Sequence, residues 1–218
     1  MSELRQRRLA ALQAAGLYLV TDDSMEPGRR QSVVAEALAA GTRVVQLRDK
    51  RALGGALLRE AATLAALCHE YGALLIVNDR ADVAVAAGAD GVHVGQDDLP
   101  LVAARQVVGP DLLVGVSASF PKEAEAADRG GADYVGFGAM YVTATKPDAE
   151  YAGPRLLAEV RSRVRVPLVA IGGITLENAP EVFAAGADLV AVVSAVFQAA
   201  APAHAVRALL ERSAAARS

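Results

Sequence analysis

The sequence predicts a single-domain α/β protein, a (β/α)8 TIM barrel that begins with a short lead helix. Two observations carry this prediction: eight short apolar runs alternate with helical stretches, and one supersecondary pattern recurs four times along the 218 residues. Each strand–helix unit takes roughly 25 residues, the usual size of a βα unit. Continuous apolar strands that alternate with helices indicate a parallel sheet covered by helices, and eight such units close into a barrel.

The recurring pattern is a helix tail, a glycine and an apolar strand, as in LAAGTRVVQL, AAGADGVHVG, RGGADYVGFG and AAGADLVAVV. The four glycines are Gly41, Gly88, Gly131 and Gly186. Glycine just past a helix end enters the left-handed region without steric penalty, so it is the expected cap. A doubly wound open sheet is the structural alternative, but it would usually not repeat so regularly, and no GxGxxG follows the first strand.

The elements are expected in a simple order. A lead helix covers residues 1–15, because Glu3 and the direct run into a strand favour a helix over a transit peptide. Its basic residues Arg5, Arg7 and Arg8 are expected on a solvated face. The strands are expected at residues 16–21, 44–50, 74–78, 91–95, 112–117, 134–138, 166–173 and 189–194. One domain then spans residues 1–218, with 213–218 as a loose tail.

Composition excludes several classes of function. A net charge of −3 without a long basic run argues against nucleic-acid binding. No apolar stretch is long enough to span a bilayer, so no membrane partner is expected. The one cysteine, Cys68, allows no intrachain disulfide and fits a cytoplasmic protein. The sequence leaves a monomer and a homo-oligomer both open.

Polar residues gather at the ends of the predicted strands, where barrel enzymes build their active sites. Gln46, Arg48 and Lys50 occupy alternate positions of VVQLRDK, so they are expected on one face of a strand. Buried unpaired charges are costly, which favours a mouth that holds an anion such as a diphosphate. Arginine offers a bidentate fork to phosphate and lysine a point charge.

Carboxylates follow two neighbouring strands. Asp79 follows the third strand, and Asp97 and Asp98 follow the fourth. Adjacent strands lie about 4.8 Å apart, so two carboxylates can share one Mg²⁺ and leave it open positions for phosphate oxygens. Spacing alone leaves Asp97 and Asp98 equally eligible. It also leaves open that Asp79 or Asp98 caps the following helix.

A second anion subsite is expected after the last two strands. Loops after strands 7 and 8 of a barrel commonly bind phosphate through backbone N–H groups. Here these loops carry Gly172-Gly173 and Val193-Ser194. A bare turn would explain the two glycines equally well, so the position after strand 7 carries the argument.

A set of motifs marks a family resemblance. The segments VQLRDK, VNDR, GVHVGQDDLP, GVSAS, VGFGAMYVTATK, VAIGGI and AVVSA occur in this order. Together they resemble the thiamine phosphate synthase family over residues 16–197. The elements QLR-x-K, GQ-x-D-LP and T-x-TK are specific in combination. The family joins a hydroxymethylpyrimidine diphosphate to a hydroxyethylthiazole phosphate and releases pyrophosphate, so both small molecules are the implied substrates.

The resemblance also implies roles for individual residues. It implies that Asp79 and Asp98 hold Mg²⁺, and that Arg48, Lys50, Ser117 and Lys146 act in catalysis. The implied substrate contacts are Gln46, Arg48, Asp49, Lys50, Asn78, Ser117, Thr143, Ala144, Thr145, Lys146, Gly173, Val193 and Ser194.

Other functions remain as alternatives. A related thiazole tautomerase shares the barrel, but it is expected to need a histidine after the fifth strand, where this chain has Ser119 and Phe120. A non-catalytic binder of thiazole phosphate would not need the aspartate pair. A generic phosphate-binding isomerase or epimerase leaves the T-x-TK loop unexplained. His93, inside the fourth strand, is expected to be a satisfied barrel histidine rather than a base.

Overall fold

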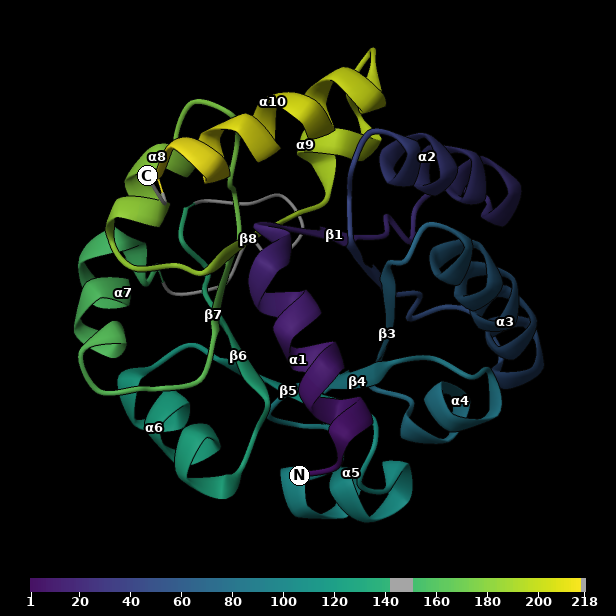
Figure 1. The fold of residues 1–218 in the computed structure, drawn as a ribbon, viewed down its shortest axis with the longest axis horizontal. Coiled ribbons are helices and arrows are strands. Elements are labelled where there is room, and N and C mark those ends of the chain that lie inside the picture. Colours follow the sequence, from purple (N-terminus) through teal and green to yellow (C-terminus); the bar gives the residue numbers. More distant parts are fainter. Residues whose placement is uncertain (142–150, 217–218) are drawn as a thin grey trace.

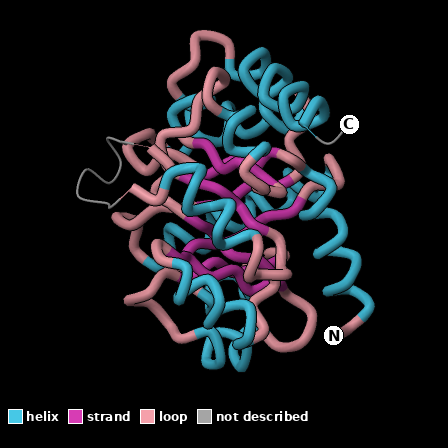
Figure 2. The backbone as a smooth tube through the Cα atoms, turned by 90° about the vertical axis from the view of Figure 1, so that its left-hand side faces the viewer, coloured by secondary structure: helices cyan, strands magenta, loops and turns pink. Residues whose placement is uncertain are grey.

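The computed structural model describes residues 1–141 and 151–216 as a closed barrel of parallel strands surrounded by helices (Figures 1 and 2). Each strand pairs with its neighbour in sequence, and β8 closes the barrel against β1. The strands are β1 Leu17–Val20, β2 Val44–Leu47, β3 Leu74–Asn78, β4 Gly91–Val94, β5 Leu113–Ala118, β6 Tyr134–Phe137, β7 Leu168–Ile171 and β8 Leu189–Val192. The predicted fold class is therefore confirmed.

The helices form the outer layer in Figure 1, except for α1, which lies across the centre of the view. They are α1 Glu3–Ala15, α2 Pro27–Ala39, α3 Gly54–Glu70, α4 Ala81–Ala86, α5 Leu101–Val108, α6 Pro121–Gly130, α7 Gly153–Arg161, α8 Ala179–Ala184, α9 Ser194–Phe197 and α10 Pro202–Ala216. None of the helices in the described ranges is both long and apolar enough to cross a membrane. The chain is helical through Ala216 and Ser213 is buried, so residues 213–216 continue α10 in the part where a loose tail was expected.

The apolar core has two parts because each strand is buried on both faces. One part lies between the strands and the outer helices, and the other fills the barrel interior. The interior also includes Leu12 and Ala15 of α1, which crosses one end of the barrel in Figure 1. The lead helix therefore closes the barrel at the end where the strands begin, and the opposite end is the mouth.

Two arginines of α1 correct the expectation of a wholly solvated basic face. Arg5 Nε donates to Asp133 Oδ1 at 2.7 Å, and Arg8 Nε donates to Asp90 Oδ1 at 2.9 Å. Only Arg7 is mainly exposed, in a surface pair with Glu3. The expectation was wrong for Arg5 and Arg8 because their partners lie more than eighty residues away in sequence.

The partner aspartates belong to the repeated pattern. Asp90, Asp133 and Asp188 each precede a strand and accept the N–H of a residue at the start of the preceding strand, at 2.9, 2.7 and 2.8 Å. Each also pairs with an arginine of a helix, Arg8 of α1, Arg105 of α5 or Arg161 of α7, so one carboxylate ties two strand starts to a helix. In the first repeat, LAAGTRVVQL, the position of this aspartate is occupied by Arg43. The pattern that predicted the fold thus marks the barrel's closed end.

Candidate active site

The barrel mouth collects the residues that follow the strands. Gln46 lies inside β2 and is buried, with its side chain in the barrel interior. Arg48 and Lys50 lie beyond Leu47, where β2 ends, so the strand is shorter than expected. Arg48 is half-buried and Lys50 is exposed. The two cations therefore sit in the loop at the mouth and not along a continuous strand face.

Asp79 and Asp98 come together at this mouth. Burial and a hydrogen-bonding contact with the Asp98 carboxyl raise the pKa of Asp79, while the Lys50 ammonium opposes the rise. Lys50 Nζ lies 3.5 Å from Asp79 Oδ2. Asp98 is half-buried, whereas its neighbour Asp97 is exposed. The structure therefore places Asp98, and not Asp97, beside Asp79.

Neither aspartate caps a helix. Helix α4 has Arg80 at its N-cap position and α5 has Pro100, without a side-chain cap hydrogen bond at either. Asp98 Oδ2 instead accepts the N–H of Gly95 at 2.9 Å, and a Cβ on Gly95 would lie 2.8 Å from that oxygen. The capping alternative is wrong, and the Asp98 carboxylate is held by its own loop toward Asp79.

Asp79 has an unusual backbone. Its φ of 62° makes it the one residue other than glycine with a positive φ among those the structure describes. The left-handed region costs an ordinary residue about 1 kcal/mol or more, and aspartate and asparagine tolerate it best. The Asp79 N–H donates to the His93 carbonyl at 2.7 Å, which holds the turn. Backbone strain of this kind clusters at functional sites.

The backbone of Arg48 is held by Thr21, the residue that follows β1. Its N–H donates to Thr21 Oγ1 at 2.9 Å, and the Thr21 hydroxyl donates back to the Arg48 carbonyl at 3.0 Å. The guanidinium donates from Nη1 to Asp23 Oδ2 at 3.0 Å. The side chain of Asp23 is 28% exposed, so this pair can exchange its partner for an anion at modest cost.

Asp49 lies elsewhere. Its carboxylate pairs with the buried Arg30 at 2.9 Å and accepts the N–H groups of Arg51 and Ala52, both at 2.9 Å. The residue lines a groove between α2 and α3, on the outside of the barrel. The structure thus makes Asp49 an anchor of the loop that carries the two cations, where the family resemblance implied a substrate contact.

Ser117 and Asn78 lie at the ends of β5 and β3 and are half-buried. The Ser117 hydroxyl is 2.8 Å from His93 Nε2, and its carbonyl accepts from the side chain of Gln96. Gln46 Nε2 donates to the Tyr18 hydroxyl at 2.9 Å. Sequence reasoning did not select Tyr18 for the site, and no local motif around it could have done so.

The residues expected to form a second anion subsite follow β7 and β8 at the mouth. Gly172 and Gly173 have φ values of 103° and 65°, a turn that other residues adopt with strain. Asn178, which the sequence analysis missed, fixes this turn by donating from Nδ2 to the Gly173 carbonyl at 3.0 Å. Val193 precedes α9 and Ser194 begins it, with Ser194 exposed. Thr143, Ala144, Thr145 and Lys146 lie outside the described residues.

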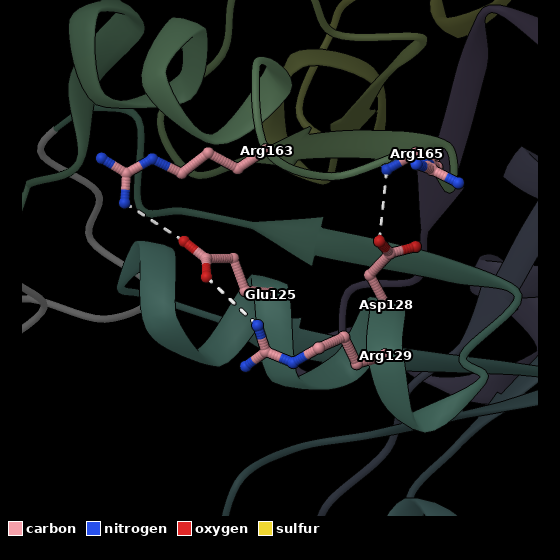
Figure 3. A pocket seen from close by; sticks show the side chains of 5 residues that line it. All are labelled: Glu125, Asp128, Arg129, Arg163 and Arg165. Atoms are coloured by element: carbon pink, nitrogen blue, oxygen red, sulfur yellow. Dashed lines mark hydrogen bonds and ion pairs between the residues drawn. The ribbon is translucent and has the colours of Figure 1, made fainter.

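A hollow of about 690 Å³ lies away from this mouth, beside α6 and the start of β7 (Figure 3). Its lining is charged, with Arg129 and Arg163 both paired to Glu125. The N–H groups of Arg165 and Val166 lie 3.4 Å from the Asp128 carboxylate. These charges largely satisfy one another near the amino end of the barrel, so the hollow does not compete with the mouth as the active site.

Sequence and structure comparisons relate the chain to known proteins. A family model described as thiamine monophosphate synthase matches residues 17–196. A thiamine-phosphate synthase of Methanospirillum hungatei JF-1 is 50% identical over 183 residues, covering 83% of this chain and 89% of that protein. One from Methanoculleus marisnigri is 48% identical over 203 residues, covering 92% and 96%. The solved thiamine phosphate pyrophosphorylase from Pyrococcus furiosus has a TM-score of 0.88 at 37% identity, covering 95% and 100%. The chain belongs to the thiamine monophosphate synthase family.

Proposed function

We propose that the chain condenses 4-amino-2-methyl-5-(diphosphooxymethyl)pyrimidine with 4-methyl-5-(2-phosphooxyethyl)thiazole to give thiamine phosphate and pyrophosphate. Family membership supports the reaction. In the structure, the observation that carries the proposal is the pair of adjacent carboxylates, Asp79 and Asp98, with Lys50 beside them at the mouth. A phosphate-binding barrel without metal-assisted chemistry would have no need to hold two carboxylates together.

The two aspartates fit a magnesium ion. The raised pKa of Asp79 reflects burial and a second carboxyl group in contact with it, which a divalent cation would relieve. The described residues contain no cluster of three or more histidine, cysteine or acidic ligands. A pair suits Mg²⁺, which keeps several waters and binds phosphate oxygens. When bound, the ion would neutralise charge on the departing diphosphate.

The cationic side chains of the mouth act on the same negative charge, that of the departing diphosphate. The bond between the methylene carbon and the diphosphate oxygen breaks, and its electron pair leaves with pyrophosphate. The thiazole nitrogen then forms a bond to that carbon. Arg48 and Lys50 stabilise the developing negative charge from fixed positions. The electron-rich aminopyrimidine supports positive charge on its methylene carbon, so the chain needs no nucleophile of its own.

Binding is divided between two sides of the mouth. Gln46, Asn78 and Ser117 would hold the pyrimidine, and the turn at Gly173 with Val193-Ser194 would hold the thiazole phosphate through backbone N–H groups. Thr143, Ala144, Thr145 and Lys146 join these sets on the strength of the family motif T-x-TK. The two anions thus meet the same mouth from opposite sides, one with the metal pair and one without it.

The one cysteine of the chain fits a cytoplasmic setting for the reaction. Cys68 is fully buried and burial raises the pKa of its thiol to about 12, so it is an inert packed side chain. We place the protein in a reducing cytoplasm, where such a thiol persists. Both a monomer and a homo-oligomer remain compatible with this mechanism.

The test is incubation with both substrates and Mg²⁺, following thiamine phosphate by fluorescence after oxidation and pyrophosphate separately. The expected result is equal amounts of the two products, and none in excess chelator. Isomerisation of a thiazole phosphate in the absence of the pyrimidine would instead identify a tautomerase. Tight binding of thiazole phosphate without any product would identify a silent binder.

A further inference from the structure

A chain of hydrogen bonds crosses the barrel interior below the mouth. Gln46 Nε2 donates to Tyr18 Oη at 2.9 Å, and Tyr18 Oη lies 2.8 Å from Tyr134 Oη. Tyr134 Oη lies 3.2 Å from His93 Nδ1, and His93 Nε2 lies 2.8 Å from Ser117 Oγ. The five residues come from β2, β1, β6, β4 and β5. This hydrogen-bond chain therefore joins Gln46 and Ser117, which are proposed to hold the pyrimidine. The three residues between them were given no functional role by the sequence.

The barrel is shaped around this chain. Tyr18 and Tyr134 are 2% and 0% exposed, and the His93 ring stacks on Tyr134 with ring centres 5.5 Å apart. A Cβ on Gly115 would lie 2.1 Å from the Tyr134 ring, and one on Gly136 would lie 2.9 Å from His93 Cε1. Any other residue at these glycines would displace the two rings. The two glycines thus leave the space that the rings of this hydrogen-bond chain occupy.

With a neutral His93 ring, each of these hydrogen bonds has one donor and one acceptor when all of them run in the same direction. Burial raises the pKa of both Tyr18 and Tyr134 well above the ordinary value, so each hydroxyl keeps one proton to donate. A neutral imidazole donates from one nitrogen and accepts at the other. With Gln46 donating to Tyr18, both hydroxyl protons have an acceptor if Tyr18 donates to Tyr134 and Tyr134 donates to His93 Nδ1. His93 Nε2 then donates to Ser117 Oγ.

The two ends consequently have opposite hydrogen-bonding character. Gln46 presents its Oε1 as an acceptor, and Ser117 keeps its own proton to donate. If the Gln46 amide turned over, every bond in the chain would reverse and the ends would exchange roles. In both directions one end donates and the other accepts. An amino group beside a ring nitrogen is the complement of such a pair.

We propose that Tyr18, Tyr134 and His93 are positioning residues that couple Gln46 and Ser117 into one donor–acceptor pair for the amino-bearing edge of the pyrimidine. This inference rests on the proposed function, since the aminopyrimidine is the substrate named there. It assigns selection for the amino group to buried residues that do not touch the substrate.

The experiment compares Tyr134→Phe with the unaltered protein on two substrates. One is the aminopyrimidine diphosphate, and the other is the analogue with hydrogen in place of the amino group. The intrinsic electronic effect of the amino group is common to both proteins and cancels in the comparison. The expected result is that the preference for the amino substrate, as a ratio of kcat/KM, falls about tenfold in the variant, the size of one lost hydrogen bond.

Three further measurements keep the outcome interpretable. Tyr18→Phe breaks the chain at a different link and should reduce the preference similarly. Tyr71→Phe, on the outer surface at the end of α3, should leave it unchanged. The Kd for thiazole phosphate should stay at its original value in every variant, which reports an intact barrel.

The two proposals can fail separately. If the unaltered protein makes no thiamine phosphate, the proposed function is wrong. If it makes thiamine phosphate while Tyr134→Phe and Tyr18→Phe both keep the full preference for the amino substrate, the positioning role is overturned and the reaction stands.

Discussion

Single residues in this barrel show which polar groups the fold satisfies. Thr21 and Thr42 are both buried threonines. Thr21 Oγ1 exchanges two hydrogen bonds with the backbone of Arg48. Thr42 Oγ1 is the one buried side-chain polar atom that lacks a partner among the described residues. The equivalent position in the other three repeats is alanine, so this hydroxyl is a local exception to the repeat.

Replacing Thr42 by valine should therefore stabilise the protein. Valine has nearly the same shape and removes a buried hydroxyl that lacks a hydrogen bond, so we expect the free energy of unfolding to rise by about 1 kcal/mol. Urea unfolding followed by circular dichroism measures the change. The matched control is Thr21→Val, which should lower the free energy of unfolding. If Thr42→Val were as destabilising as the control, the hydroxyl would have a partner after all.

At the scale of elements, one buried guanidinium organises the loops on the cationic side of the mouth. Arg30 of α2 is fully buried and donates to Glu60 at 2.7 and 2.5 Å and to Asp49 at 2.9 Å. It also donates to the carbonyls of Asp22 and Met25 at 3.3 and 3.1 Å. These bonds use all five of its N–H donors. The loops after β1 and β2 are thereby fixed to α2 and α3.

Removal of Asp49 tests this anchoring. Asp49→Ala deletes one partner of Arg30 and the acceptor of two loop N–H groups. We expect the free energy of unfolding to fall by about 2 kcal/mol and the KM for the pyrimidine diphosphate to rise about tenfold, because Arg48 and Lys50 lose their fixed positions. The Kd for thiazole phosphate should not change.

Asp97→Ala is the control for this substitution, since Asp97 is an exposed aspartate of the same mouth. It should change both quantities little. A lower KM in Asp49→Ala would mean that the Asp49 carboxylate repels the diphosphate directly, and the anchoring role would be wrong.

The strands and the mouth could be predicted because they depend on local patterns. Apolar runs and helix-ending glycines indicated the strands, and the polar residues after them indicated Asp79 and Lys50, whereas the choice of Asp98 over Asp97 needed the family resemblance. Local patterns could not predict the contacts between residues that lie far apart in sequence and meet across the barrel. Tyr18 and Tyr134 meet across 116 positions of sequence, and nothing near either residue indicates the other. The expected substrate contact of Asp49 came from the family resemblance alone, and its ion pair with Arg30, nineteen positions earlier, has no local signal in the sequence.

The whole molecule is closed at one end and open at the other. Helix α1 covers the amino end of the barrel, with Arg5 and Arg8 bound to aspartates whose side chains are 2% and 7% exposed. The predicted active site lies at the opposite end. Stability and activity should consequently be separable by substitutions at the two ends, as is usual for barrels of this kind.

The double variant Arg5→Met/Arg8→Met tests this separation. Each substitution removes one partner of a buried carboxylate, so we expect a loss of about 2 kcal/mol per site and a clear drop in Tm. The kcat of the remaining folded protein should be unchanged. Arg7→Met, which breaks only a surface pair with Glu3, should have almost no effect on either quantity. A large fall in kcat in the double variant at a temperature where it is folded would contradict the separation.

The central claim is that Asp79 and Asp98 together hold the metal that serves the diphosphate. Binding of Mn²⁺ as a probe for Mg²⁺, followed by electron paramagnetic resonance with pyrophosphate present, tests it most directly. Asparagine suits the comparison because it tolerates the backbone of residue 79 and differs from aspartate mainly in charge. We predict at least tenfold weaker Mn²⁺ binding in Asp79→Asn and in Asp98→Asn, and unchanged binding in Asp97→Asn. Binding as tight in both Asp79→Asn and Asp98→Asn as in the unaltered protein would contradict the claim.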